Sequence, residues 1–427
     1  MRTKAICLGL LLALASAHAY AQKDAARRVP VEDSPAILDP TIPGPGTAAP
    51  TCPGLEGCVP NVGCPTGSIR ISPGQSIQRA IAAAPCTGAV LCVAPGTYNE
   101  KIDFLGKPIH LVASGPGAIL DGGGTGTVVT FQTGEGKNSI LDGFQIQNGQ
   151  ANYGAGILIK DASPTIRNCK LVKNQATGSY ARGGGIGVTG AQSRPAITCT
   201  QFLGNTAAYA GGGLISTYSA DPYLRSNLFE GNRADYGGGI GVHINGRLDL
   251  GTSLLIGNQA IDGAGIHVGT TYGNVLVRRT WLKGNRATAH GGGMWVAAGF
   301  ADVINSNFDG NSAADGGGLA AGYGSMVNVA NTLFVRNQNA NSSAALINSS
   351  GSNTSVVNHY NAFFGNTGGP NYKGTYGDKG LVLLPGFGNS CRPSPGSPAI
   401  NAGIPDYHFN DLDGSRSDIG PCGGPAI

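Results

Sequence analysis

Large apolar residues recur through the middle of the chain, and each stands three residues before an asparagine. The asparagines are separated by intervals of 26 to 31 residues. The apolar positions are Leu171, Phe202, Phe229, Leu255, Leu282, Phe308, Phe334 and Phe363. The asparagines are Asn148, Asn174, Asn205, Asn232, Asn258, Asn285, Asn311, Asn337 and Asn366. A repeat of this length, built from short segments, is typical of a solenoid.

The positions before each asparagine alternate in character. A second apolar residue stands eight positions before most of the asparagines, as Ile197 and Leu224 do. A small residue, usually polar, stands five positions before, as Thr200 and Asn227 do. Alternation over four to eight residues indicates strands rather than helix. We therefore predict an all-β chain, a right-handed parallel β-helix whose coils stack about 4.8 Å apart. In such a stack the asparagines lie above one another and can hydrogen-bond along the axis.

Composition fits this stack. Glycine accounts for 71 of 427 residues, and three-glycine clusters such as Gly237–Gly239 precede the strands, where turns need positive φ or close backbone approach. Charged residues make up only 12% of the chain, because like charges stacked at the coil spacing would repel one another. A net charge of +4 without a basic stripe gives no argument for a nucleic-acid partner.

The ends of the chain differ from the repeats. Residues 1–21 have the basic start, apolar run and small-residue site of a secretory signal peptide, and no later segment is long and apolar enough to span a membrane. We expect a Pro/Cys-rich linker at 22–66, the β-helix at 67–390 and a C-terminal cap or tail at 391–427. The protein is expected to be secreted, in the extracellular space, at the cell surface or in the periplasm.

A short helix is expected to cap the first coil. Ser72, Pro73 and Gln75 have the character of N-cap, N1 and N3 residues. Ile77, Ile81 and Ala84 then form an apolar face that can cover the open end of the solenoid, which would otherwise expose a sheet edge.

Nine cysteines follow the signal segment, and an exported chain favours disulfides over metal binding. We expect Cys86 to pair with Cys92 across a short turn and Cys391 to pair with Cys422 across the tail. Cys169 and Cys199 occupy nearly equivalent points of successive repeats, and they either pair or pack inside as small apolar residues.

Three stretches resemble known families. The segment "SIQRAIAAA" through "VAPGTYNEKIDFLGKPIHLVASG" resembles the N-terminal part of pectate-lyase-like right-handed β-helix proteins. The repeats "FLGNTAAYAGGGL" and "FEGNRADYGGGI" resemble those of polymorphic outer-membrane proteins, and "SPAINAGIPDYHFNDLDGSRSDIG" resembles the end of many secreted bacterial β-helix proteins. The resemblance covers roughly residues 67–420 and implies the fold more specifically than the function.

One group of chemically capable residues is expected on the outside of the coils. If the first residue after each glycine cluster points inward, alternation places three outward columns side by side. Their notable members are Tyr236, His243, Asp262, His267, His290, Trp295 and Asp315. Tyr236, His243, His267 and Trp295 suit a sugar-binding surface, whereas Asp262, His290 and Asp315 could act as acid and base or bind a cation.

Arg182, Arg233 and Arg286 are expected beside this group, and the lyases of the resembled family use Lys or Arg as base. Arg278, Arg279, Trp281 and His359 form a second, weaker candidate patch. The leading hypothesis is binding of a polysaccharide or cell-surface glycan. The alternatives are a polysaccharide lyase or glycosidase, and an adhesin or structural envelope protein.

These patterns require no cofactor, and calcium is the one cofactor that they could accommodate. Asp411 and Asp413 lie around a glycine turn in "NDLDGSRSD", as the oxygen ligands of calcium loops do. A plain Asx turn explains the same residues.

Overall fold

The computed structural model describes residues 58, 63–322, 324–341, 346–348, 354–369, 372–373, 376–377, 381–382, 397, 399–405, 411 and 415–420. The expected signal peptide and most of the expected linker lie outside these residues. The described residues all belong to one compact unit.

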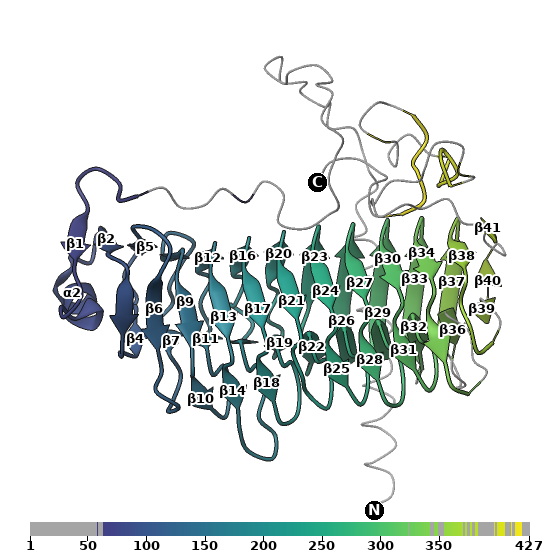
Figure 1. Ribbon diagram of the computed structural model, residues 1–427, viewed down its shortest axis with the longest axis horizontal. Coiled ribbons are helices and arrows are strands. Elements are labelled where there is room, and N and C mark those ends of the chain that lie inside the picture. The colour runs from purple at the N-terminus through teal and green to yellow at the C-terminus, as the bar shows by residue number, and fades with distance from the viewer. Residues whose placement is uncertain are drawn as a thin grey trace, which may run out of the picture. The chain divides into compact units, whose positions relative to one another are not determined.

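The described chain forms a right-handed parallel β-helix in which each full coil contributes a strand to three faces in turn (Figure 1). The first face consists of β4 (Ile102–Asp103), β7 (Val129–Phe131), β11 (Ile157–Lys160), β15 (Ile186–Thr189), β19 (Leu214–Thr217), β22 (Ile240–His243), β32 (Leu319–Ala321), β36 (Leu346–Asn348) and β39 (Tyr372–Lys373). The second consists of β1 (Ile69–Ile71), β2 (Ala89–Val93), β5 (Ile109–Ala113), β8 (Ile140–Asp142), β12 (Thr165–Arg167), β16 (Ala196–Thr198), β20 (Tyr223–Arg225), β23 (Leu248–Gly251), β33 (Met326–Ala330), β37 (Ser355–His359) and β40 (Tyr376–Gly377).

The third face is a separate sheet of 12 strands. Its strands are β3 (Gly96–Tyr98), β6 (Ala118–Asp121), β9 (Gln145–Gln147), β13 (Lys170–Val172), β17 (Gln201–Leu203), β21 (Leu228–Glu230), β24 (Leu254–Ile256), β27 (Trp281–Lys283), β30 (Asn307–Asp309), β34 (Leu333–Val335), β38 (Ala362–Phe364) and β41 (Leu381–Val382). Two-residue strands lie between the third and first faces: β10 (Gln150–Ala151), β14 (Gln175–Ala176), β18 (Thr206–Ala207), β25 (Gln259–Ala260), β28 (Arg286–Ala287), β31 (Ser312–Ala313) and β35 (Gln338–Asn339).

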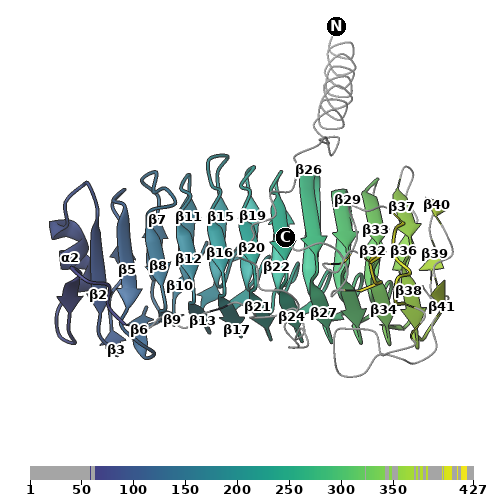
Figure 2. The same cartoon turned by 90° about the horizontal axis from the view of Figure 1, so that it is seen from above.

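Two long strands join the first and second faces. β26 (Ile266–Arg278) pairs with β22 at its start and with β23 at its end, and β29 (Met294–Ile304) continues both pairings. In Figure 2 both strands run unbroken across the bend where neighbouring coils turn. These strands merge the first two faces into one 22-stranded sheet.

The interior is a stack of apolar side chains, as the repeat predicts. The residues three positions before the ladder asparagines, from Leu171 to Phe363, are all fully buried. Phe202 and Phe229 stack with ring centroids 4.2 Å apart, and Phe308, Phe334 and Phe363 form a second stack at 4.9 and 5.2 Å. The core is therefore continuous along the axis.

The asparagines form a buried hydrogen-bonded ladder. Asn258 is typical: its Oδ1 accepts from the backbone N and the Nδ2 of Asn232 (3.0 Å each). Its Nδ2 donates to the Phe229 carbonyl (3.0 Å) and to Asn285 Oδ1 (2.9 Å). Nδ2 of each ladder asparagine from Asn174 to Asn337 donates in this way to the next one, and Asn366 is the last acceptor, which confirms axial hydrogen bonding.

Asn148 does not belong to this ladder, contrary to the expectation. It is exposed with a φ of 55°, and its Nδ2 donates to Asp121. Strand register places Gly149 opposite Asn174, and the Gly149 N–H donates to Asn174 Oδ1. The ladder thus begins one coil later than the spacing suggested.

The glycine clusters serve both of the expected purposes. Gly237 has a φ of 68°, in the left-handed region that other residues rarely adopt. A Cβ on the next residue, Gly238, would lie 2.3 Å from the Gln259 carbonyl oxygen of the following coil. The first glycine therefore makes the turn, and the second allows close coil contact.

The capping helix is α2 (Ile77–Ala83), and it begins later than expected. Its N-cap is Ser76 rather than Ser72, because the Ser76 hydroxyl accepts the Arg79 backbone N–H (3.2 Å). Glu100 supports this cap by accepting from the Ser76 hydroxyl (2.7 Å) and from the backbone N–H groups of Ile77 and Gln78. Ser72 and Gln75 instead close a preceding turn. Ile77, Ile81 and Ala84 are buried, as predicted.

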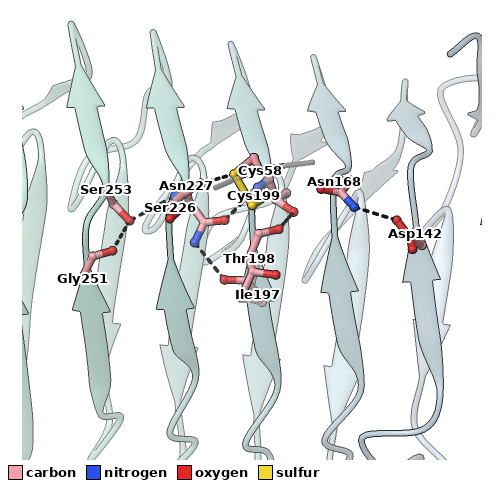
Figure 3. Close-up of a disulfide and its surroundings, with 11 residues drawn as sticks. Cys58, Asp142, Asn168, Ile197, Thr198, Cys199, Ser226, Asn227, Gly251 and Ser253 are labelled. Carbon is pink, nitrogen blue, oxygen red and sulfur yellow. Dashed lines mark hydrogen bonds between the residues drawn. A yellow bond between two sulfur atoms is a disulfide. The ribbon is translucent and has the colours of Figure 1, made fainter. Parts of the chain in front are cut away.

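Two disulfides connect the start of the described chain to the coils. Cys64 bonds Cys92 of β2, and Cys58 bonds Cys199, which follows β16 (Figure 3). The expected Cys86–Cys92 pair is wrong: Cys92 is already bonded, and Cys86 is an exposed free thiol. Cys169 is a buried free thiol, and burial raises its pKa to about 12. The expected Cys391–Cys422 pair lies outside the described residues.

Part of the C-terminal segment packs on the outside of the third face. Ala399 and Ile419 form a small apolar cluster with Leu333, Val335 and Ala362 of β34 and β38. The Gly420 N–H donates to the Asn331 carbonyl (2.8 Å). The tail therefore covers the third face at these two coils.

Candidate functional site

Strand register brings the predicted columns together on the first face. Gly241, His267, Trp295 and Ala320 are successive partners across β22, β26, β29 and β32. Backbone bridges connect Arg182, Ala210, Tyr236 and Asp262, and another connects His290 to Asp315. The column that contains His243 and Gly269 departs from the spacing of the repeat, which predicts Ala297 as its next member, because a register shift in β26 pairs Gly269 with Ala298.

A row of aromatic rings crosses these coils. We call Tyr180, Tyr209 and Tyr236, with Arg182, the aromatic patch. Tyr180 contacts Tyr209 and Tyr209 contacts Tyr236, with centroids 5.6 and 5.1 Å apart. The Arg182 guanidinium lies 4.7 Å from the centre of the Tyr209 ring, a cation–π contact. Tyr180 is 67% exposed, and Tyr209 and Tyr236 are half-buried.

Sequence reasoning missed Tyr180 and Tyr209. Tyr209 stands one residue before Ala210, which occupies the predicted column, so its ring reaches the patch from the adjacent position. The spacing of 27 residues between Tyr209 and Tyr236, close to the repeat length, was the available signal.

His243 and His267 form a buried pair behind the patch. His243 Nε2 and His267 Nδ1 are 2.9 Å apart, and the Tyr236 ring lies 5.1 Å from that of His267. Alternation predicted exposed side chains, but His243 is only 6% and His267 only 4% exposed. The glycine at position 269 leaves room for the His267 ring, since a Cβ there would lie 2.7 Å from His267 Cε1.

The surroundings keep both rings neutral near pH 7. Burial lowers the pKa of His243 from 6.5 to about 4, and the charge of Arg182 adds to this effect. Burial also lowers the pKa of His267 well below 6.5, with His243 as the second cause. The pair is therefore a poor proton donor at neutral pH.

The histidine pair makes folding stability depend on pH in a defined window. Because the folded-state pKa lies below the unfolded value, the unfolded chain binds more protons between about pH 6.5 and 4. As the pH falls from about 6.5 to 4, the shift of His243 alone should lower the free energy of unfolding by about 3 kcal/mol, at ~1.4 kcal/mol per pH unit. The lowered pKa of His267 adds to this loss. Denaturant unfolding at several pH values should show this loss.

The control is the variant H243Q/H267Q, in which carboxylate titration is retained and the pair is absent. Its stability should vary less steeply over the same window. If the free energy of unfolding varies equally steeply with pH in the two proteins, the histidine pair is not the cause of the pH dependence.

His290 lies between two carboxylates. Its Nδ1 is 2.9 Å from Asp262 Oδ1, which also accepts from the His290 backbone N–H (3.0 Å). Its Nε2 is 4.0 Å from Asp315 Oδ2. The His290 ring stacks on Trp295 at 4.7 Å, and Trp295 is only 3% exposed. Trp295 therefore supports His290 rather than offering its own face to a ligand.

Arg233 and Arg286 lie on a neighbouring part of the surface. Both are exposed and, with Gln259 between them, line a hollow that also includes Asp235, Ile261 and Thr288. Asp235 immediately precedes Tyr236 in the chain, so the hollow and the aromatic patch share a coil.

The second candidate patch is divided by the structure. Arg225 and Arg278 both contact Asp249, at 2.9 and 3.3 Å. His359 shares the column of Arg278 but lies three strands further along it, after Ile304 and Ala330. Trp281 is on the third face, in β27, with Lys283 5.5 Å from its ring. These residues do not form one site.

The metal hypothesis gains no support from the described side chains. Among them, no group of three or more His, Cys, Asp or Glu residues is arranged to hold a metal ion. Asp411 accepts the Asp418 backbone N–H at 3.3–3.4 Å, as in a turn, and Asp413 lies outside the described residues.

The described part of the chain contains no helix of the length and hydrophobicity needed to cross a membrane.

Fold and sequence comparison together define a right-handed parallel β-helix protein. Residues 124–334, slightly less than half of the chain, match the family model described as a right-handed β-helix region. No curated protein gives a significant match. The finer resemblances, to pectate lyases and to polymorphic outer-membrane repeats, are not confirmed by this match.

Proposed function

We propose that this protein binds polysaccharide on the first face of its β-helix. The observation that carries the proposal is the row of contacting tyrosine rings on neighbouring coils, with an arginine stacked on the middle ring. Aromatic faces bury the apolar face of a sugar ring, and adjacent polar groups bond its hydroxyls. A row along the axis suits a linear polymer better than a single small sugar.

Binding is favoured over turnover by the state of the candidate catalytic groups. Asp262 Oδ1 already accepts from the His290 ring and backbone. The buried histidine pair is neutral and covered by Tyr236. These contacts hold the side chains in fixed positions, which suits recognition.

An extracellular, cell-surface or periplasmic location is part of the proposal. Two disulfides in the described residues favour an oxidising compartment. A glycan outside the cytoplasm is then the accessible polymer.

The test is polysaccharide affinity with and without the tyrosine rings. If each ring contributes about 1 kcal/mol, Y209A/Y236A should bind roughly 30-fold more weakly than the parent protein. Affinity electrophoresis through gels containing a panel of neutral and acidic polysaccharides gives the comparison.

The matched control is Y223A. Tyr223 is also exposed and also carries a stacked arginine, with Arg225 3.9 Å from its ring, but it lies on the second face. Equal weakening by Y223A and Y209A/Y236A, or no retention of the parent protein in any gel, would refute the proposed surface.

A lyase or glycosidase is the second candidate, favoured by the 2.9 Å contact between His290 and Asp262. The same polymers should be assayed for unsaturated products and new reducing ends. If the parent protein releases product, and H290A releases none while unfolding at the same temperature, catalysis would replace binding as the proposed function.

A further inference from the structure

An axial trough runs beside the aromatic patch. Its floor consists of buried alanines at equivalent positions of successive coils: Ala176, Ala207, Ala234, Ala260, Ala287 and Ala313. The residues on either side of each alanine are more exposed, so two rims rise above the floor. Because alanine fills so little space, the surface is hollowed between the rims over Ala234, Ala260 and Ala287.

One rim of this hollow is positively charged at alternate coils. Arg233 is bridged to Gln259, and Gln259 pairs with Arg286. Thr206 precedes this series and Ser312 follows it, so the two charges stand alone in their column. With coils about 4.8 Å apart, the Arg233 and Arg286 backbones are separated by roughly 10 Å.

Both guanidinium groups are available to a ligand. Within the described part of the chain, neither makes an ion pair or side-chain hydrogen bond, whereas Arg225 and Arg336 are held by Asp249 and Asp309. Asp235 lies on the opposite rim and repels anions from that side. An acidic group in the trough is therefore directed toward the arginine rim.

We propose that the trough binds a linear polysaccharide carrying one acidic group per disaccharide. An extended disaccharide is about as long as two coil steps, so successive acidic groups meet Arg233 and Arg286, and the neutral sugar between them meets Gln259. Guanidinium binds carboxylate and sulfate alike, so the shared chemistry is an anionic group at disaccharide spacing. This inference rests on the proposed glycan-binding function and adds the ligand's charge spacing.

The test compares the binding of four polymers at equal sugar concentration and low salt. Hyaluronan has one carboxylate per disaccharide, κ-carrageenan has one sulfate per disaccharide, polygalacturonate has one carboxylate per sugar, and dextran has no charge. The parent protein should prefer the first two, and their ranking distinguishes carboxylate from sulfate. R233Q/R286Q should lose at least tenfold in affinity for both.

Two further variants sharpen the comparison. R194Q removes another exposed arginine outside the trough and should bind as the parent protein does. Q259R places a charge on every coil and should shift preference toward polygalacturonate. Thermal unfolding should be similar for all of these surface variants.

The outcomes separate the two proposals. If R233Q/R286Q binds like the parent, or Q259R strengthens hyaluronan and polygalacturonate equally, the charge-spacing inference is wrong. If Y209A/Y236A still weakens binding in that case, the proposed function stands without it. If the parent protein binds none of the four polymers or the wider panel, the proposed function itself fails.

Discussion

Replacing Asn258 by alanine is expected to lower the free energy of unfolding by about 3–5 kcal/mol. The substitution leaves the Asn232 N–H and the Phe229 carbonyl without their side-chain partner in the buried ladder. It also removes one of the bonds of Asn232 Nδ2 and of Asn285 Oδ1. Each buried polar group left unsatisfied costs about 1–3 kcal/mol. Urea unfolding followed by circular dichroism measures the change.

N274A provides the control, because Asn274 is exposed in β26 and outside the ladder. Its stability should lie within about 0.5 kcal/mol of the parent value. A loss for N258A no larger than that of N274A would show that the ladder does not contribute to stability.

Removing the Cys58–Cys199 disulfide should also have a large effect. The bond joins residues 141 positions apart, against 28 for Cys64–Cys92. In the chain-entropy account, closing so long a loop stabilises the folded state by about 4–5 kcal/mol. C58S/C199S should therefore unfold at lower urea concentration than C64S/C92S, for which a loss of about 3–4 kcal/mol is expected.

C86S serves as the comparison, since Cys86 is exposed and free and its removal should change stability little. Measuring all variants with and without reductant tests the assignment further. A C58S/C199S protein whose stability still falls in reductant as much as the parent's would contradict the bridge.

The fold could be predicted because stacking repeats the same environment at every coil. Each buried apolar position, such as Phe229 or Leu255, appears many times in one chain, so the period emerges without other sequences. Errors arose where an end departs from the repeat. Asn148 has the spacing of a ladder asparagine, but strand register places Gly149 opposite Asn174. Ser72 is followed by the residues expected after an N-cap, but the helix begins after Ser76, which bonds Glu100 of another coil.

The sequence predicted which backbone positions of the candidate site lie side by side, but it did not predict the contacts of their side chains. Register could place Tyr236, Asp262 and His290 on one side of the coils, because bridges follow the repeat. It could not show that His243 and His267 are covered, since this depends on how Tyr209 and Tyr236 fold over them. Cysteine pairing failed for a similar reason: sequence proximity favoured Cys86, whereas the fold brings Cys64 to Cys92.

The asparagine ladder has a direction. Each coil's asparagine backbone N–H and Nδ2 bond to the amide oxygen of the coil that follows, from Asn174 through Asn337. Each coil therefore donates to the coil after it and accepts from the coil before it, so the two axial surfaces of a coil are chemically different. A coil stacked in the reverse orientation would place donor against donor at one interface and acceptor against acceptor at the other, so the ladder fixes the orientation of every coil as well as its register.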